Sequence, residues 1–223
     1  MNDRRIRIII GHYGSGKTEF SVNYALKLAE MGFKVALSDL DIVNPYFRSR
    51  EKAAFLEGKG IRVISSSLGH NFSLDLPAIS SEIVGPIQDP DSQVILDVGG
   101  NSVGAKVLAK FYEEIIDKEY DMLCVVNTNR AETQTVEGIM YHVRAIEAVS
   151  QLKVTGLINN THLLRETTLE TVLEAQEIIK EASQKLSIPI KYISTIESVA
   201  KMLPEGLEGE IFPITMYMRD VWM

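Results

Sequence analysis

Glycines, a lysine and a threonine near the N-terminus have the spacing of a site that binds phosphate groups. Gly11, Gly16, Lys17 and Thr18 fit the pattern G-x-x-x-x-G-K-[ST]. Gly14 and Gly16 have no side chains, so the backbone there can curl around a phosphate with its N–H groups pointing inward. Lys17 would bring positive charge to the β- and γ-phosphates, and Thr18 a hydroxyl to Mg²⁺. The residues predicted to contact the nucleotide here are Gly11, Gly14, Ser15, Gly16, Lys17, Thr18 and Glu19.

The segments on either side of this loop are those that a phosphate-binding loop requires. The run Ile8, Ile9, Ile10 in residues 5–10 is typical of a strand that is buried on both faces of a parallel sheet. A helix is expected over 18–31, ending at Gly32, and its positive N-terminal end would face the phosphates. An ordinary strand-to-helix turn that binds no phosphate can also match this pattern by chance. The strand before and the helix after it favour nucleotide binding.

Asp97 closes the apolar strand predicted at 93–98 and is followed by two glycines. From that strand end it would reach a Mg²⁺ ion held by Thr18, and the spacing to Gly100 would offer a backbone N–H to the γ-phosphate. The alternative is a simple strand-ending turn, because Asp and Gly are common in turns. The phosphate loop favours the metal role.

A second acidic pair, Asp39 and Asp41, ends the strand predicted at 34–40. Alternation along a strand puts both side chains on the same side. One division of roles has Asp39 holding the loop through backbone hydrogen bonds while Asp41 faces the γ-phosphate. Both could instead cap the following turn.

Strands and helices alternate along the chain, which indicates a parallel sheet covered by helices on both faces. We expect one domain over 1–223, a doubly wound α/β fold with about seven strands. The expected strands are 5–10, 34–40, 61–64, 93–98, 121–127, 154–159 and 188–193. The expected helices are 18–31, 46–56, 77–84, 101–118, 131–149 and 166–186, with a loop at 65–76 in which Phe72 could mark a docking surface.

The composition is that of a water-soluble protein with a sizeable core, at 45% hydrophobic and 24% charged residues. A formal charge of −7 argues against a general nucleic-acid binder, since neutralising phosphates needs clustered Lys and Arg. Cys124 is the only cysteine, which excludes an internal disulfide framework. No signal peptide or membrane-spanning stretch is visible, so a cytoplasmic location is expected.

Residues 203–223 are more apolar than an exposed tail should be. Pro213, a single basic residue at 219 and three nearby glutamates argue against a membrane anchor. We therefore expect this segment to pack on the core or on a partner, with Met218 and Trp222 as anchors.

Four motifs together resemble the MinD/ParA nucleotide-binding family, which includes the nucleotide domains of cobyrinic acid a,c-diamide synthases. They are the phosphate loop, DLD at 39–41, DVGG at 97–100 and GLINN at 156–160. The resemblance covers residues 5 to about 193. It implies a doubly wound sheet and an ATPase that forms a homodimer with nucleotide between the subunits.

The same resemblance implies roles for individual residues. Lys17 would be the phosphate lysine, Thr18 a Mg²⁺ ligand, and Asp41 the switch residue beside the metal that positions water. Asp97 would be the second carboxylate linked to Mg²⁺, and Asn160 the amide that reads adenine.

The chain departs from this family at position 12, where members usually carry a second lysine that reaches the partner's phosphates. His12 stands there, and a neutral imidazole cannot replace a permanent ammonium. We expect His12 to be an exposed loop residue; the alternative is a pH-sensitive substitute. Arg48 and Arg50 are conceivable replacements, although each taken singly fits a solvated helix face.

The loop also resembles that of the nickel-insertion GTPases, so the base needs a separate argument. Residues 159–162 are Asn-Asn-Thr-His where those proteins have N-K-x-D. The Asp of that motif accepts two hydrogen bonds from guanine, which His162 cannot do. The histidines and the one cysteine are scattered without metal-ligand spacing. Adenine is therefore favoured.

The leading hypothesis is a Mg²⁺-dependent ATPase acting as a nucleotide-dependent dimerisation switch, with ATP or ADP bound, a protein client or activator, and no nucleic acid or membrane partner. The alternatives are a GTPase accessory protein resembling a metallochaperone, a nucleotide-bound scaffold with negligible turnover, and, ranked last, an amide-forming synthetase. Residues 127–130 end a strand on the same edge as the phosphate loop and could line the nucleotide or the dimer seam.

Overall fold

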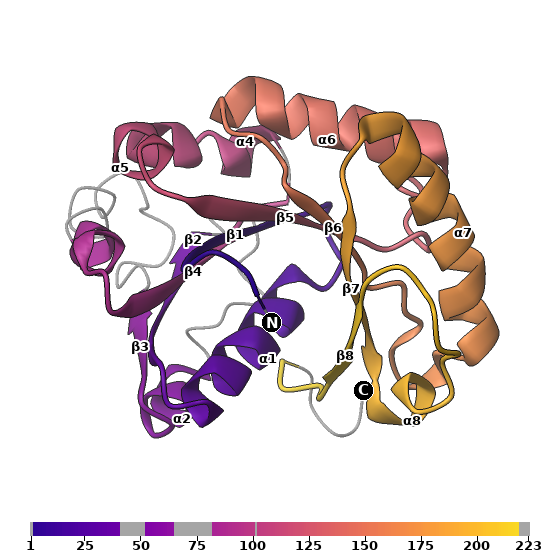
Figure 1. The fold of residues 1–223 in the computed structure, drawn as a ribbon, viewed down its shortest axis with the longest axis horizontal. Helices are drawn as coiled ribbons and strands as arrows, with labels where there is room; N and C mark the ends of the chain where they lie inside the picture. Colours follow the sequence, from indigo (N-terminus) through magenta and orange to yellow (C-terminus); the bar gives the residue numbers. More distant parts are fainter. Residues whose placement is uncertain (1, 41–51, 65–81, 101, 219–223) are drawn as a thin grey trace.

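A computed structural model gives the fold, and it describes residues 2–40, 52–64, 82–100 and 102–218. Eight parallel strands form one twisted sheet in the order β3-β2-β4-β1-β5-β6-β7-β8 (Figure 1). The strands are β1 Ile6–Ile10, β2 Lys34–Leu40, β3 Ile61–Ile64, β4 Ser92–Val98, β5 Tyr120–Val126, β6 Gly156–Asn159, β7 Ile190–Ile196 and β8 Glu210–Ile214.

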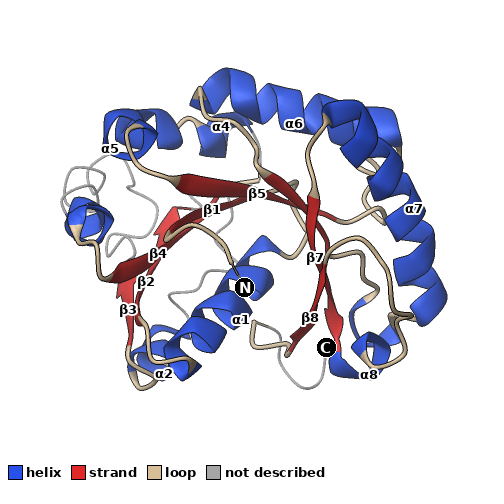
Figure 2. Ribbon diagram, viewed as in Figure 1, coloured by secondary structure: helices blue, strands red, loops and turns tan. Residues whose placement is uncertain are grey.

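Helices cover both faces of this sheet (Figure 2). The α-helices are α1 Lys17–Glu30, α2 Ala53–Glu57, α4 Ser102–Ala105, α5 Tyr112–Ile116, α6 Val136–Ser150, α7 Leu169–Leu186 and α8 Glu197–Ala200, and the 3₁₀ turns are η2 Leu108–Phe111 and η3 Leu164–Glu166. Helices α1 and α2 pack on one face, and α4, α5, α6 and α7 on the other. The predicted doubly wound parallel sheet is therefore confirmed.

Strand β1 is at the centre of the sheet, between β4 and β5, and all five of its residues are buried. Ile6, Ile8 and Ile10 pack into the core beneath α6 and α7, while Ile9 packs into the core beneath α1. This alternation explains why a continuous apolar run was needed, because neither face of a central parallel strand meets water. The run ends directly at the phosphate loop.

Several elements differ from the sequence prediction, and two of the differences bear on the site. Residues 102–116 form α4, η2 and α5 rather than one long helix, and Gly104, a poor helix former, lies in the first of these pieces. A Cβ at Gly104 would be 2.6 Å from the Cα of Gly99, so this turn packs backbone against backbone. Strand β8, which contains Pro213, was not predicted. It is an edge strand, where a proline without an N–H is tolerated.

Other predictions fall partly outside the described residues. The helix predicted at 46–56 is described only from residue 52, and the one at 77–84 only from residue 82, with 82–88 helical. The loop at 65–76 with Phe72 lies outside the described residues. In the part of the chain that is described, no helix is long and apolar enough to cross a membrane.

Four aromatic rings join α1 to the two last strands of the sheet. Phe212 of β8 has its ring centroid 5.1 Å from that of Phe20, 5.7 Å from that of Tyr24 and 5.6 Å from that of Tyr192. All four side chains are buried, and Met218 packs into the same cluster. The contact fixes the C-terminal segment on the helix that follows the phosphate loop.

Replacing Phe212 with alanine should lower the free energy of unfolding by about 3–5 kcal/mol, because a buried ring leaves a cavity that the rigid neighbours cannot fill. Urea denaturation measures the loss. Phe33→Ala, at a ring that is 43% exposed, is the control and should change stability by less than about 0.5 kcal/mol. Equal effects of the two substitutions would contradict the aromatic cluster.

Candidate functional site

The loop between β1 and α1 has a backbone that its glycines make possible. Gly14 and Gly16 have φ angles of 74° and 88°, the left-handed region in which a side chain is strained. A Cβ at Gly16 would lie 2.3 Å from Asn160 Nδ2, and one at Gly11 2.3 Å from the carbonyl oxygen of Val125. The glycines are thus required both for conformation and for close packing.

Asn160 holds the loop from the end of β6. Its Nδ2 donates a hydrogen bond of 2.7 Å to the carbonyl oxygen of Ser15, and its side chain is buried. Its Oδ1 is buried without a hydrogen-bond partner among the described residues. The structure thus places Asn160 against the loop with one acceptor unused, and its predicted role in reading adenine stays a prediction.

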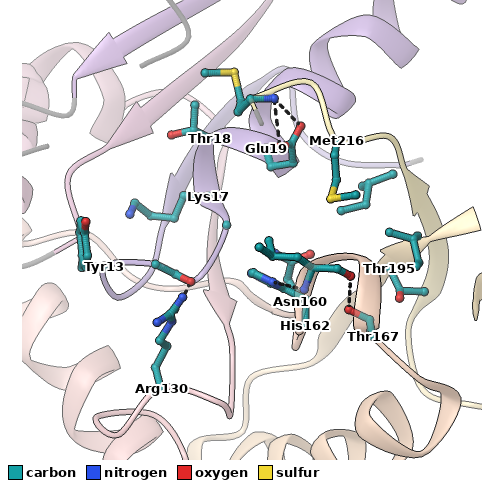
Figure 3. Close-up of a pocket in the computed structure, with 16 residues that line it drawn as sticks. Tyr13, Lys17, Thr18, Glu19, Arg130, Asn160, His162, Thr167, Thr195 and Met216 are labelled. Carbon is teal, nitrogen blue, oxygen red and sulfur yellow. Dashed lines mark hydrogen bonds between the residues drawn. The ribbon is translucent and has the colours of Figure 1, made fainter. Parts of the chain in front are cut away.

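The turn that follows β5 holds the tip of the loop. Arg130 Nε donates to the carbonyl oxygen of Gly14 at 3.0 Å (Figure 3). The turn is itself fixed, because Asn127 O accepts from Arg130 N at 3.1 Å and from Thr133 Oγ1 at 2.8 Å. Residues 127–130 therefore lie beside the loop, as their place at a strand end suggested.

The charged residues predicted to act on phosphate and metal lie at the carboxyl ends of the central strands. Lys17 begins α1 and is only 5% exposed. Asp39 and Asp97 are register partners on β2 and β4, and both are buried. A Cβ at Gly100 would lie 2.9 Å from Lys17 Nζ, so the D-x-x-G segment adjoins the loop lysine. Asp41, Arg48 and Arg50 lie outside the described residues.

Thr18 lines the cavity next to Lys17, and the buried carboxylate of Asp97 is on the strand adjacent to β1. A hydroxyl and a carboxylate are ligands that Mg²⁺ prefers, and this ion usually keeps waters and substrate phosphates as its other ligands. Each of the two groups is thus chemically suited to Mg²⁺ bound together with a nucleotide, and their joint role as ligands stays a prediction. In the described ranges, no group of three or more His, Cys, Asp and Glu side chains is arranged to hold a metal by itself.

A cavity of about 260 Å³ extends from the loop toward the C-terminal segment. Its far end is largely apolar. The lining residues are Tyr13, Gly14, Gly16, Lys17, Thr18, Glu19, Arg130, Asn160, His162, Leu164, Thr167, Thr195, Ile196, Ile214, Met216 and Met218. Thr195 is buried at the end of β7, and its Oγ1 has no hydrogen-bond partner in the described part of the chain. The cavity therefore combines a polar phosphate end with an apolar slot.

Residues 215–218, here called the C-terminal strap, form one wall of this cavity and are tied to α1. Glu19 accepts a hydrogen bond from the backbone N–H of Tyr217 at 2.6 Å. It also accepts from the backbone N–H of Met218 at 3.1 Å (Figure 3). Asn23 exchanges two hydrogen bonds of 2.8 Å with the backbone of Thr215. Glu19 was predicted to contact nucleotide, and what its carboxylate contacts here is the strap.

His162 follows β6 at the cavity wall. Its Nδ1 accepts a hydrogen bond from the backbone N–H of Leu164 at 3.3 Å, which assigns the proton of the neutral ring to Nε2. A Cβ at Gly16 would lie 3.4 Å from that Nε2. The His162 ring thus presents an N–H donor beside the loop, at the position where the N-K-x-D motif has a carboxylate.

His12 was expected to be an exposed loop residue, and this is wrong. Its side chain is only 24% exposed, and its Nδ1 lies 3.6 Å from Glu132 Oε2. The ring also contacts that of His142, with centroids 5.7 Å apart. Position 12 is half-buried because α6 brings His142 next to the loop, a long-range contact that the local sequence did not indicate.

Several of the residues that line the site were not anticipated. The strap residues Met216 and Met218 and the β7 residue Thr195 line the cavity although they lie almost 200 residues from the loop. For Thr195, its place just after a predicted strand was a usable signal, because ligands gather at the carboxyl ends of parallel strands. For the strap, no local pattern connects residues 215–218 to Glu19.

The fold is similar to solved structures of FtsY proteins. The cell division protein FtsY of Thermotoga maritima matches with 22% identity and a TM-score of 0.59, over 88% of this chain and 64% of that one. The signal recognition particle receptor FtsY of Elizabethkingia anophelis, in complex with GDP, matches with 20% identity and a TM-score of 0.56, over 87% and 58%. Chloroplast FtsY of Physcomitrella patens matches with 16% identity and a TM-score of 0.58, over 86% and 59%.

These likenesses and the loop together define a class: the chain has the parallel α/β fold of the P-loop nucleoside triphosphatases. At such identities they show the fold alone, and the chain spans 58–64% of the length of these three proteins. No protein-family model matches the sequence, and no curated protein sequence does either.

Replacing Glu19 with alanine should loosen the C-terminal strap, because two backbone N–H groups lose their acceptor. We expect the free energy of unfolding to fall by about 1–3 kcal/mol. Amide exchange at Tyr217 and Met218 should accelerate more than elsewhere. Glu30→Ala removes an exposed carboxylate from the end of the same helix and is the control. Unchanged exchange at the strap in Glu19→Ala would show that the anchor is elsewhere.

Stability should fall as the pH drops below about 6.5, because His142 is neutral in the fold. Burial, with the nearby His12 and Lys17 charges, lowers the pKa of His142 to about 4. Between these values the unfolded chain binds the extra proton, so the free energy of unfolding decreases by up to about 1.4 kcal/mol per pH unit of acidification. His142→Gln should remove this part of the slope in urea titrations at pH 7, 6 and 5. Parallel profiles for the two proteins would contradict the assignment.

Proposed function

We propose that this protein binds ATP with Mg²⁺ and hydrolyses it, and that nucleotide occupancy controls the association of two copies. The observation that carries the proposal is the convergence of the loop backbone, the buried Lys17 at the start of α1 and the apolar slot in one cavity. The dimer rests on the resemblance to MinD/ParA proteins, as does the role of Asp41 in positioning water.

The phosphates would lie along residues 14–18. There the loop N–H groups and the positive end of the 14-residue helix α1 attract anionic oxygens. Lys17 would hold the β- and γ-phosphates, while Thr18 and Asp97 would hold Mg²⁺, which when bound neutralises the charge that develops on the transferred phosphoryl group. Because Asp97 and Lys17 are buried, their charges act in a medium less polarisable than water.

The base would lie in the apolar slot, between Leu164 and the methionines of the C-terminal strap. The unused Oδ1 of Asn160 is an acceptor that suits the amino group of adenine. Guanine offers two neighbouring N–H donors that are best met by a carboxylate. Glu19 is the only carboxylate among the described residues that line the cavity, and it already accepts from the strap backbone. This chemistry favours adenine.

A GTPase is the second candidate, and one finding favours it. The fold is similar to that of an FtsY structure in complex with GDP. Under this alternative, His162 and Asn160 would have to recognise guanine without a carboxylate. A scaffold with negligible turnover is the third candidate. It is favoured by His12, which pairs with Glu132 at the position where a lysine was expected.

Binding and turnover measurements with two variants test these alternatives. We expect wild type to bind ATP at least tenfold more tightly than GTP in the presence of Mg²⁺, and to release phosphate slowly. Lys17→Ala should lose about a hundredfold or more in ATP affinity, whereas Asp41→Ala should bind ATP nearly as wild type and stop releasing phosphate. Lys110→Ala, at an exposed site, is the control.

Each outcome selects one candidate. Tighter binding of GTP would establish the GTPase instead. Tight ATP binding without phosphate release, even with cell extract added, would establish the scaffold. Normal turnover in Asp41→Ala would show that another residue positions the water. Wild-type affinity in Lys17→Ala would refute the phosphate loop itself.

A further inference from the structure

We propose that Arg130 contacts the phosphate groups of the bound nucleotide and supplies, from the same chain, a second positive charge beside Lys17. The inference rests on the proposed function. Its starting observation is that the guanidinium lines the cavity and lies against the tip of the phosphate loop (Figure 3). A Cβ at Gly14 would be 2.9 Å from Arg130 Cζ and 3.0 Å from its Nη2, so only a glycine allows this approach.

The guanidinium has donors left for a ligand. It carries five N–H donors in a fixed plane, and the Nε–H is used on the carbonyl oxygen of Gly14. Among the described residues, no carboxylate forms an ion pair with Arg130, and the nearest acidic residue in sequence, Glu132, faces His12 instead. A cation in a half-buried position without a protein counter-ion is matched by an anion, and phosphate oxygens suit the planar fork of arginine.

Hydrogen bonds hold the backbone of the turn that carries Arg130, and the bond from Nε to Gly14 O holds the side chain, so little ordering remains to be done when ligand binds. Asn127 accepts from the backbone N–H of Asn129 at 3.0 Å through its side chain, besides the two bonds to its carbonyl oxygen. The backbone N–H of Thr133 donates to Arg130 O at 2.9 Å. The base of the arginine is therefore fixed on both sides, which is the preorganisation that electrostatic stabilisation requires.

The position also bears on the missing lysine. His12 lies against Glu132 and His142, where its ring is engaged with protein groups rather than extended toward another subunit. Arg130 brings a permanent charge to the same loop at Gly14. The positive charge that the resemblance places at position 12 would then be supplied by Arg130, from the turn after β5 of the same chain.

A purely structural role must be separated from phosphate contact, because the bond to Gly14 O could serve only to hold the loop. The experiment compares Arg130→Gln, which keeps a donor and loses the charge, with Arg130→Lys, which keeps the charge. Arg144→Gln makes the same change in net charge at an exposed site on α6 and is the matched control. Affinities are measured for the nucleoside triphosphate that wild type prefers, for its diphosphate and, by competition, for its nucleoside.

Arg130→Gln should bind the triphosphate and the diphosphate about ten- to hundredfold more weakly than Arg144→Gln does. Its affinity for the nucleoside should stay within twofold of that of Arg144→Gln. Arg130→Lys should recover most of the loss, and the salt dependence of binding should be shallower in Arg130→Gln than in Arg130→Lys. The midpoint of thermal unfolding without ligand should be the same in all the proteins within about 2 °C.

Three results would overturn the inference. If Arg130→Gln and Arg130→Lys lost the same affinity for all three ligands, including the nucleoside, Arg130 would only shape the loop. If Arg130→Gln had the same affinities as Arg144→Gln, Arg130 would neither contact the phosphates nor shape the loop. If wild type bound no nucleotide at all, the proposed function would fail first, and that result is visible without any Arg130 variant.

Discussion

The left-handed backbone at Gly14 and Gly16 allows two separate parts of the chain to touch the phosphate loop at distances that no side chain would permit. Asn160 reaches the loop from the end of β6, and Arg130 reaches it from the turn after β5. Each side chain donates its hydrogen bond to a carbonyl oxygen of the loop, so neither bond uses a backbone N–H group of the loop. The loop conformation therefore depends on contacts made far along the chain as much as on its own glycines.

The strand order concentrates charge at one place. Strands β2, β3 and β4 lie on one side of β1, and β5 to β8 lie on the other. The strand order therefore reverses at β1, and ligands in open α/β sheets bind at such a switch point. The buried carboxylates of Asp39 and Asp97 are at matched register beside the strand that leads to Lys17. Burying three charges is costly unless they are compensated, so this edge of the sheet is built around electrostatics rather than packing.

Local sequence patterns predicted the sheet and the phosphate loop well, because both depend on short-range rules. Strands β2 and β3 begin and end at the predicted residues, and the G-x-x-x-x-G-K-T spacing fits the loop that the structure shows. The patterns failed where a contact is decided by distant packing. The edge strand β8 was not predicted, and the long helix expected at 101–118 is broken into shorter pieces. Neither the partial burial of His12 nor the wall of the cavity formed by the C-terminal strap has a signal within ten residues of the site.

The hydrogen bonds from Tyr217 and Met218 to Glu19 join residues that are separated by almost the whole length of the chain. On a ribosome that adds about 5–20 residues per second, Glu19 would be made roughly 10–40 s before its partners. Until then the apolar slot has no outer wall, and Phe20 and Tyr24 lack the ring of Phe212 that covers them. The nascent protein thus exposes these aromatic side chains to water, and the cavity is completed only when synthesis has passed the strap.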